Sequence, residues 1–122
     1  METTLIVEDH DEVRQLTAAI LEECGYQVLA AAAGAEALVA AADHPGPIHL
    51  LITDVLMPHM SGKELAERLR QAHPETKVLY MSGYAADVFS RVGAAGPEIE
   101  YIQKPFTPEE LAIKVRKVLC EG

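Results

Sequence analysis

Basic residues are scarce in this chain of 122 residues: ten Lys and Arg accompany nineteen Asp and Glu, for a formal net charge of −9. Proteins that bind nucleic acids through the phosphate backbone need clustered Lys and Arg. The charge balance therefore argues against a nucleic-acid partner. It suits instead the binding of a cation, or contact with a basic surface on a partner protein.

Cysteines and long apolar runs are few as well. The two cysteines, Cys24 and Cys120, lack the spacing of metal ligands and are expected to be reduced thiols, with a disulfide between them as the alternative. No apolar run reaches the ~18 residues of a membrane-spanning helix, which argues against membrane insertion. The first residues, METTLIVEDHDE, lack the basic start and long apolar stretch of a signal peptide. We therefore expect a soluble, cytoplasmic protein.

What the chain does contain is typical of one folded domain. Hydrophobic residues make up 49% and charged residues 24%, close to the averages of globular proteins. The length lies within the roughly 100–200 residues of a single domain. We therefore expect one domain over residues 1–122, without a linker or an internal repeat.

Five short apolar runs alternate with helical patterns along the chain. The runs are Thr4–Val7, Tyr26–Ala31, Ile48–Thr53, Lys77–Met81 and Ile99–Ile102. The third run is apolar on both strand faces, as expected for a buried strand of a parallel sheet. This alternation predicts a doubly wound α/β fold, with a five-stranded parallel sheet covered by helices on both faces. The flavodoxin-like strand order 2-1-3-4-5 is the leading candidate.

Helical periodicity and capping residues indicate the helices between these runs. The expected core-facing residues are Val13, Leu16, Ile20 and Leu21; Ala35, Leu38, Val39 and Ala42; Leu65, Leu69 and Ala72; and Leu111, Val115, Val118 and Leu119. The expected end signals are an N-cap at Asp11, Gly25 past the first helix, and capping boxes at Ser61–Glu64 and Thr107–Glu110. A further helix over about residues 85–92 has few apolar anchors and precedes a stretch rich in Gly, Ala and Pro at 93–97.

Polar and charged residues follow the carboxyl ends of the predicted strands. Glu8 and Asp9 follow the first strand, Asp54 the third and Ser82 the fourth, and the fifth leads to Lys104. Ligands of such sheets bind at this edge, beside the switch point between strands 1 and 3. A divalent cation would relieve the repulsion among three carboxylates, and oxygen ligands suit Mg²⁺ better than zinc. The lysine and hydroxyl supply donors for an anion, so the set predicts phosphoryl-transfer chemistry.

Each of these residues has an ordinary structural explanation when taken alone. An acidic pair can serve as the charge at a helix N-terminus, and an aspartate before a proline-containing loop is a common turn residue. Ser82-Gly83 is an ordinary turn dipeptide, and a lysine before proline is usually a solvated loop charge. Their occurrence together at successive strand ends favours a functional site.

The motifs resemble those of the receiver domains of two-component response regulators, over essentially the whole chain. The resemblance rests on Glu8-Asp9, Asp54-Val55-Leu56-Met57-Pro58, Ser82-Gly83 and Lys104-Pro105-Phe106, in that order and spacing. The residues around Ser82 and Lys104 are similar to those of receivers attached to sensor histidine kinases.

The resemblance implies that Asp54 is the nucleophile and phosphorylation site. It would accept a phosphoryl group from a phosphohistidine on a sensor histidine kinase or a histidine phosphotransfer domain. The carboxylates of Glu8, Asp9 and Asp54 would hold Mg²⁺ together with the backbone carbonyl of Leu56, with Asp9 the more direct ligand. Such a domain is a signalling protein rather than an enzyme, although it promotes its own phosphorylation and dephosphorylation.

Further roles follow from the same resemblance. Lys104 would pair with Asp54 before phosphorylation and with a phosphoryl oxygen afterwards, and the Lys104–Pro105 peptide would be cis. Ser82 would donate to another phosphoryl oxygen. Tyr101 matches the family's aromatic switch position. Ser82 and Tyr101 would couple phosphorylation to the face formed by the fourth helix, fifth strand and fifth helix, which would bind an effector or a second receiver.

Three features depart from the usual pattern: Ser82, Leu56 and the segment 84–97, which has few helix anchors. Ser82 replaces the threonine of many members, and the Leu56 side chain cannot hydrogen-bond an attacking water.

Other functions compete with that of a phosphorylated receiver. A non-phosphorylated pseudo-receiver that only binds proteins is one alternative. A haloacid dehalogenase-type phosphatase needs a DxD motif after its first strand, and a flavodoxin-type nucleotide binder needs a Ser/Thr/Gly-rich phosphate loop there. His10 and His59 lie near the acidic residues and are expected to be solvent-facing loop residues, because Mg²⁺ prefers oxygen.

Overall fold

The computed structural model of the chain describes residues 2–83 and 100–120. The described elements are β1 (Thr3–Val7), α1 (Asp11–Glu23), β2 (Gln27–Ala31), α2 (Gly34–Asp43), β3 (Leu50–Asp54), α3 (Gly62–Ala72), β4 (Lys77–Ser82), β5 (Glu100–Gln103) and α5 (Pro108–Cys120). The expected helix over residues 85–92 and the segment 93–97 lie outside the described residues.

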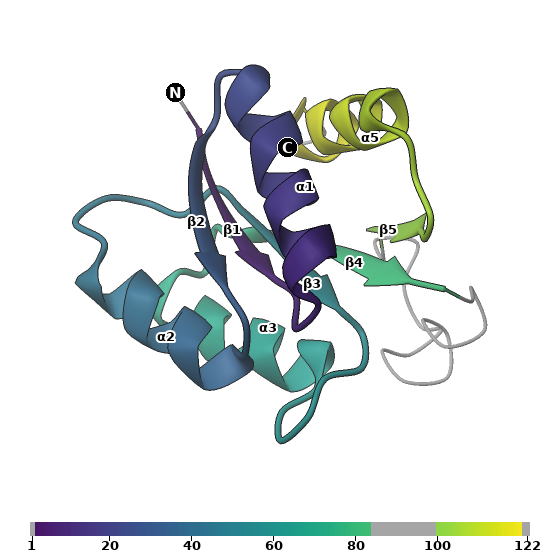
Figure 1. Cartoon of the computed structure of the whole chain (residues 1–122). Helices are drawn as coiled ribbons and strands as arrows, with labels where there is room; N and C mark the ends of the chain where they lie inside the picture. The colour runs from purple at the N-terminus through teal and green to yellow at the C-terminus, as the bar shows by residue number, and fades with distance from the viewer. Residues whose placement is uncertain (1, 84–99, 121–122) are drawn as a thin grey trace.

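The five strands form one parallel sheet in the order β2-β1-β3-β4-β5, which confirms the predicted fold. Helices α1 and α5 cover one face of the sheet, and α2 and α3 cover the other (Figure 1). The neighbouring strands β1 and β3 pair Val7 with Thr53, so the residues that follow both strands emerge side by side. None of the described helices is both long and apolar enough to cross a membrane.

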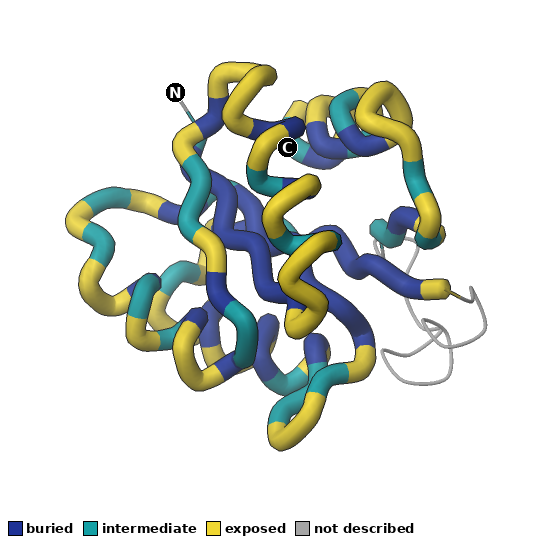
Figure 2. Tube along the Cα trace, in the orientation of Figure 1, coloured by how far each residue is buried: buried dark blue, intermediate teal, exposed yellow. Residues whose placement is uncertain are grey.

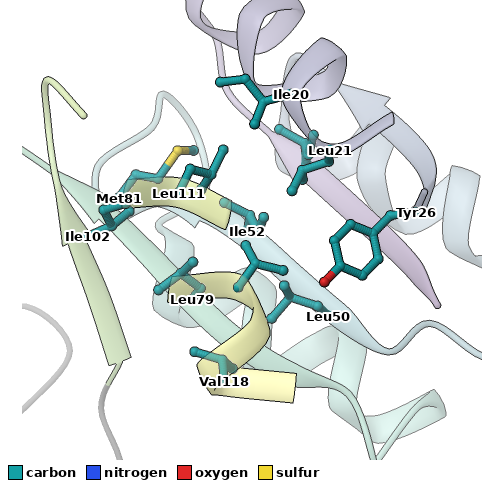
Figure 3. Close-up of a cluster of buried hydrophobic side chains, with 12 residues drawn as sticks. Ile20, Leu21, Tyr26, Leu50, Ile52, Leu79, Met81, Ile102, Leu111 and Val118 are labelled. Atoms are coloured by element: carbon teal, nitrogen blue, oxygen red, sulfur yellow. The ribbon is translucent and has the colours of Figure 1, made fainter. Parts of the chain in front are cut away.

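Side chains alternate between two apolar cores, one on each face of the sheet. In β1, Ile6 belongs to the core beneath α1 and α5, whereas Leu5 and Val7 belong to the core beneath α2 and α3. Figure 3 shows the first core, where Ile20 and Leu21 of α1 lie over the sheet with Leu111 and Val118 of α5. Figure 2 shows that the central strands β1 and β3 are buried, whereas the edge strand β2 and the outer helix faces are largely exposed or half-buried. Burying each leucine or isoleucine contributes roughly 2 kcal/mol.

The buried face of α2 differs from the predicted one. Val39 is 62% exposed, and Ala35 and Ala42 are exposed as well, whereas Ala37 and Ala41 are buried. This part of the prediction was wrong because an alanine-rich helix has few large side chains to mark its inner face. Small side chains on the buried face let the helix lie close to β1 and β2, which α2 contacts.

The buried face of α1 also differs from the prediction at one position. Leu16 is 54% exposed, and the neighbouring Thr17 is fully buried in its place. The Thr17 hydroxyl donates to the backbone carbonyl of Val13, with 2.7 Å between the oxygens. Because this bond satisfies the hydroxyl within the helix, Thr17 can face the core although it is polar. The apolar pattern had assigned that place to the adjacent Leu16. Ala72 in α3 is likewise exposed rather than buried.

The helix ends follow the capping signals with two exceptions. His10 rather than Asp11 is the N-cap of α1, and Asp11 is instead the first helical residue. At α5 the Thr107–Glu110 capping box forms in both directions, as predicted. At α3 only the Ser61 hydroxyl caps, by accepting from the Glu64 amide, because the Glu64 carboxylate pairs with Arg68. Past α1, Gly25 has a φ of +93°, which favours glycine.

The two cysteines, Cys24 and Cys120, are free and exposed. The thiol form expected from the sequence is therefore found, and the alternative disulfide is not.

Candidate functional site

The carboxyl ends of four strands bring together the residues singled out by the sequence. Glu8 and Asp9 follow β1, Asp54 ends β3, Ser82 ends β4, and Lys104 follows β5. The backbone amide of Lys104 donates to the Ser82 carbonyl (2.8 Å), which ties the segment after β5 to the end of β4. These strand ends border a hollow of about 190 Å³. The residues that line it are Asp9, His10, Asp54, Val55, Leu56, Met81, Ser82, Gly83 and Lys104.

Lys104 is the one lysine or arginine among the described residues that line the hollow, and it contacts two carboxylates. Its Nζ lies 2.5 Å from Oδ1 of Asp54 and 3.1 Å from Oε2 of Glu8. The Glu8 side chain is fully buried and that of Asp54 nearly so. A buried carboxylate without a partner is strongly unfavourable, so the shared ammonium group stabilises both. The ion pair expected between Lys104 and Asp54 is present, and the second contact with Glu8 was not anticipated.

The carboxylates occupy different depths. Asp9 and Asp54 line the hollow, whereas Glu8 is not among its lining residues. One ammonium group does not neutralise three carboxylates, so the site retains an excess of negative charge. Carboxylate and carbonyl oxygens are the ligands that Mg²⁺ takes in proteins. The donor set therefore fits a hard divalent cation held by Asp9, Asp54 and the Leu56 carbonyl, with Glu8 in support.

His10 contacts the acidic residues more closely than expected. Its side chain is 75% exposed, as predicted for a loop residue. Its Nδ1 nevertheless lies 3.1 Å from Oε1 of Glu8 and 3.4 Å from Oδ1 of Asp9. The interpretation of His10 as purely solvent-facing was therefore incomplete. His59, in contrast, is exposed in the loop between β3 and α3, where its φ is +69°.

Gly62 is a site residue that the sequence analysis missed. It is the first residue of α3, and its amide donates to the Val55 carbonyl (3.0 Å). A Cβ atom built at this position would lie only 2.1 Å from the backbone oxygen of Asp54. Only glycine therefore lets α3 begin so close to the end of β3, which makes Gly62 a positioning residue for Asp54. The signal in the sequence that could have indicated this role is a glycine directly after Ser61, the N-cap of the helix.

The other residues singled out by the sequence lie around the hollow or beside it. Ser82 is buried and lines the hollow, and Leu56 lines it with 49% of its surface exposed. Tyr101 is half-buried and packs in a small apolar cluster with Val55 and Tyr80, outside the lining. Burial raises the pKa of Tyr80, and the negative charge of Glu67 adds to the rise. The Lys104–Pro105 peptide is cis, as expected from the resemblance.

A second polar cluster lies at the opposite, amino-terminal edge of the sheet. Arg116 of α5 donates to the Tyr26 hydroxyl (2.7 Å) and pairs with Glu2 (3.1 Å). The hydrogen bond from Arg116 lowers the pKa of Glu2, whereas burial raises the pKa of Tyr26. This cluster joins α5 to the strand starts and lies apart from the hollow.

Comparison with known proteins identifies relatives of the whole domain. A family model described as the response regulator receiver domain matches residues 4–116. The sensor kinase CckA of Brucella abortus is 39% identical over 117 residues, covering 96% of this chain and 12% of that protein. The response regulator receiver protein CpdR of the same organism is 32% identical, with 98% of each chain covered. The chain also spans about half the length of transcriptional regulators such as CssR of Bacillus subtilis (51%).

Solved structures agree with these relatives. The chemotaxis protein CheY4 of Vibrio cholerae has a TM-score of 0.85 at 31% identity, covering 97% of this chain and 98% of that one. The receiver domain of the hybrid histidine kinase CckA has a TM-score of 0.80 at 36% identity, covering 96% and 98%. The strand order, the residues gathered at the strand ends and the family match agree, and the chain belongs to the response regulator receiver family of two-component signalling systems.

Proposed function

We propose that Asp54 accepts a phosphoryl group from a phosphohistidine, in a reaction that depends on Mg²⁺. The observation that carries the proposal is the ion pair of Lys104 with Asp54, 2.5 Å long, in a hollow also lined by Asp9 and Ser82. The donor is a sensor histidine kinase or a histidine phosphotransfer domain. Similarity to the CckA sensor kinase and to CpdR supports a partner of this kind.

The chemistry assigns a separate task to each residue. A carboxylate oxygen of Asp54 attacks phosphorus, an O–P bond forms, the P–N bond to the histidine breaks, and the imidazole leaves. Lys104 passes from the Asp54 carboxylate to a phosphoryl oxygen, and the Ser82 hydroxyl donates to another. Asp9, Asp54 and the Leu56 carbonyl would hold Mg²⁺, with Glu8 in support. When bound, the ion supplies the positive charge that lets an anionic phosphoryl group approach the acidic site.

Removal of the metal tests the reaction directly. The chain incubated with acetyl phosphate and Mg²⁺ is expected to gain one phosphoryl adduct by intact mass, because Asp54 is the carboxylate that both contacts Lys104 and lines the hollow. With excess EDTA the adduct is expected to disappear. The same yield of adduct in EDTA would contradict the Mg²⁺ requirement, and no adduct in Mg²⁺ would contradict the proposed function.

Leu56 is expected to prolong the lifetime of the acyl phosphate. It lines the hollow, and its apolar side chain cannot orient a water molecule for attack on phosphorus. In Leu56→Asn, the amide is expected to speed phosphate release about fivefold, since one hydrogen bond contributes about 1 kcal/mol. Phosphate release is followed after excess phosphodonor is removed. Leu16→Asn is the control, because Leu16 is similarly exposed but does not line the hollow. Release at the wild-type rate or slower in Leu56→Asn would exclude the shielding role.

We propose that phosphorylation changes the conformation of Ser82 first and, through it, that of Tyr101. Ser82 ends β4 and pairs in register with Gln103 of β5, and Tyr101 lies two residues earlier in β5, opposite Tyr80. A shift of Ser82 toward a phosphoryl group therefore acts at the strand pair that carries Tyr101. We propose that the neighbouring face, which includes β5 and α5, binds an effector or a second receiver. The expected helix at 85–92 belongs to the same proposal and lies outside the described residues.

Two alternative functions are not favoured. A pseudo-receiver that only binds proteins is disfavoured, because its function does not require a nearly buried aspartate paired with a lysine beside a hollow. A haloacid dehalogenase-type phosphatase is disfavoured by the position of Asp54 on β3 and by the match to the receiver family over residues 4–116.

A further inference from the structure

His10 is the one imidazole that contacts the acidic residues in the described part of the chain. One oxygen of Glu8, one of Asp9 and Nδ1 of His10 all lie within 4.8 Å of one another. Asp54 is outside this group, and its Oδ1 pairs with Lys104. The Glu8 oxygen that faces His10 also lies 3.3 Å from Nζ of Lys104, so Glu8 is shared between the two sides of the site. The side that carries His10 differs because it offers a nitrogen as well as oxygens.

The distances within this group are those of ligands that share a metal ion. Donors bound to a tetrahedral metal at about 2.0–2.1 Å lie about 3.3 Å from one another. The imidazole Nδ1 lies 3.1 Å from the Glu8 oxygen and 3.4 Å from the Asp9 oxygen. The side chains thus need little rearrangement to converge on one ion. A hydrogen bond from the imidazole to the carboxylates is the competing explanation for the same distances.

A nitrogen ligand from His10 would change which metal ions the site prefers. Imidazole suits zinc, nickel, copper and iron, whereas Mg²⁺ prefers oxygen and keeps several of its waters. Zn²⁺ takes imidazole nitrogens and carboxylate oxygens as ligands, and sites with three protein ligands leave a further position for water. The His10 ring is largely exposed, so it is free to turn toward an ion that enters from solvent.

We propose that His10 supplies a nitrogen ligand to the cation site, so that this domain binds a first-row transition-metal ion such as Zn²⁺ more tightly than Mg²⁺. The inference rests on the cation site of the proposed function and extends it to metal selectivity. For this ion, Glu8 and Asp9 complete the protein ligands in place of Asp54 and the Leu56 carbonyl, which serve Mg²⁺ in the proposed function. Lys104 keeps its contacts with Asp54 Oδ1 and with Oε2 of Glu8.

Calorimetric titration of the whole chain with ZnCl₂ and, separately, with MgCl₂ tests the selectivity. In His10→Asn the ratio of Zn²⁺ to Mg²⁺ affinity is expected to fall about tenfold or more, since even indirect partners of a metal site contribute tenfold or more to affinity. His59→Asn is the matched control, because His59 is an exposed loop histidine and asparagine tolerates its positive φ. Its ratio is expected to remain that of the wild type. A purely structural effect of His10 would lower both affinities together and leave the ratio unchanged.

Pulsed electron paramagnetic resonance with Mn²⁺ as the bound ion tests coordination itself. The wild-type chain is expected to show modulation from a directly bound nitrogen, and His10→Asn is expected to lose it. An unchanged affinity ratio, or nitrogen modulation that survives in His10→Asn, would overturn the inference and leave the hydrogen-bond explanation. Neither result bears on phosphorylation of Asp54, which the phosphoryl adduct formed with Mg²⁺ tests separately.

Discussion

Replacing Asp54 with asparagine is expected to abolish phosphorylation by acetyl phosphate in Mg²⁺. The amide has nearly the shape of the carboxylate but is not a nucleophile of comparable strength, and it removes one of the expected metal ligands. Intact mass measurement after incubation with the phosphodonor gives the yield of the adduct. Asp43→Asn is the matched control, because Asp43 is an exposed aspartate at the end of α2, away from the hollow.

The fold of Asp54→Asn is expected to survive, which makes the loss interpretable. Lys104 keeps a partner in the variant, since its Nζ also contacts Glu8 at 3.1 Å. Removing one of two carboxylates that share one ammonium group leaves no unpaired buried charge. The thermal unfolding midpoint is therefore expected to remain close to that of the wild type. A phosphoryl adduct at wild-type yield in Asp54→Asn would show that another residue is the acceptor.

Replacing Gly62 with alanine is expected to destabilise the domain and to slow phosphorylation together. The added Cβ would lie 2.1 Å from the backbone oxygen of Asp54, so the end of β3 or the start of α3 must move. Overpacking of this kind costs about 1–3 kcal/mol in free energy of unfolding. Displacement of the nucleophile by a few tenths of an ångström is expected to lower the phosphorylation rate about fivefold. Urea unfolding and the time course of the phosphoryl adduct measure the two effects.

Gly34→Ala is the matched control for this substitution. Gly34 is also the first residue of its helix, so the change in helix propensity is the same. Its added Cβ would meet the Sδ of Met60 at 2.7 Å, and a methionine side chain can move aside where a backbone oxygen cannot. The loss of stability is expected to be below about 1 kcal/mol, with phosphorylation little changed. Equal stability and equal rates for the two variants would show that Gly62 does not position Asp54.

Local pattern predicted the strands and the residues at the functional edge, and made 2-1-3-4-5 the leading candidate for the strand order. Apolar runs such as Ile48–Thr53 are typical of strands buried on both faces of a sheet, and alternation with helices then favours a parallel sheet and leaves few topologies. Because all parallel strands end at one edge, Asp9, Asp54, Ser82 and Lys104 had to meet there. This part of the site followed from strand positions alone and needed no knowledge of side-chain contacts.

Packing between elements decided the features of the structure that the sequence did not predict. The buried face of α2 could not be predicted from an alanine-rich stretch. The helix lies close to the sheet, so the small Ala37 and Ala41 are buried and the larger Val39 is exposed. The contact of Lys104 with Glu8 depends on the depth of Glu8 beneath the hollow, which sequence spacing does not encode. Gly62 matters only because α3 begins against the Asp54 carbonyl. The sequence by itself determined which residues share the carboxyl edge of the sheet, since that depends on local periodicity. Tertiary structure alone decided the contacts that were not anticipated, such as that of Lys104 with Glu8, since these depend on distances between segments far apart in the chain.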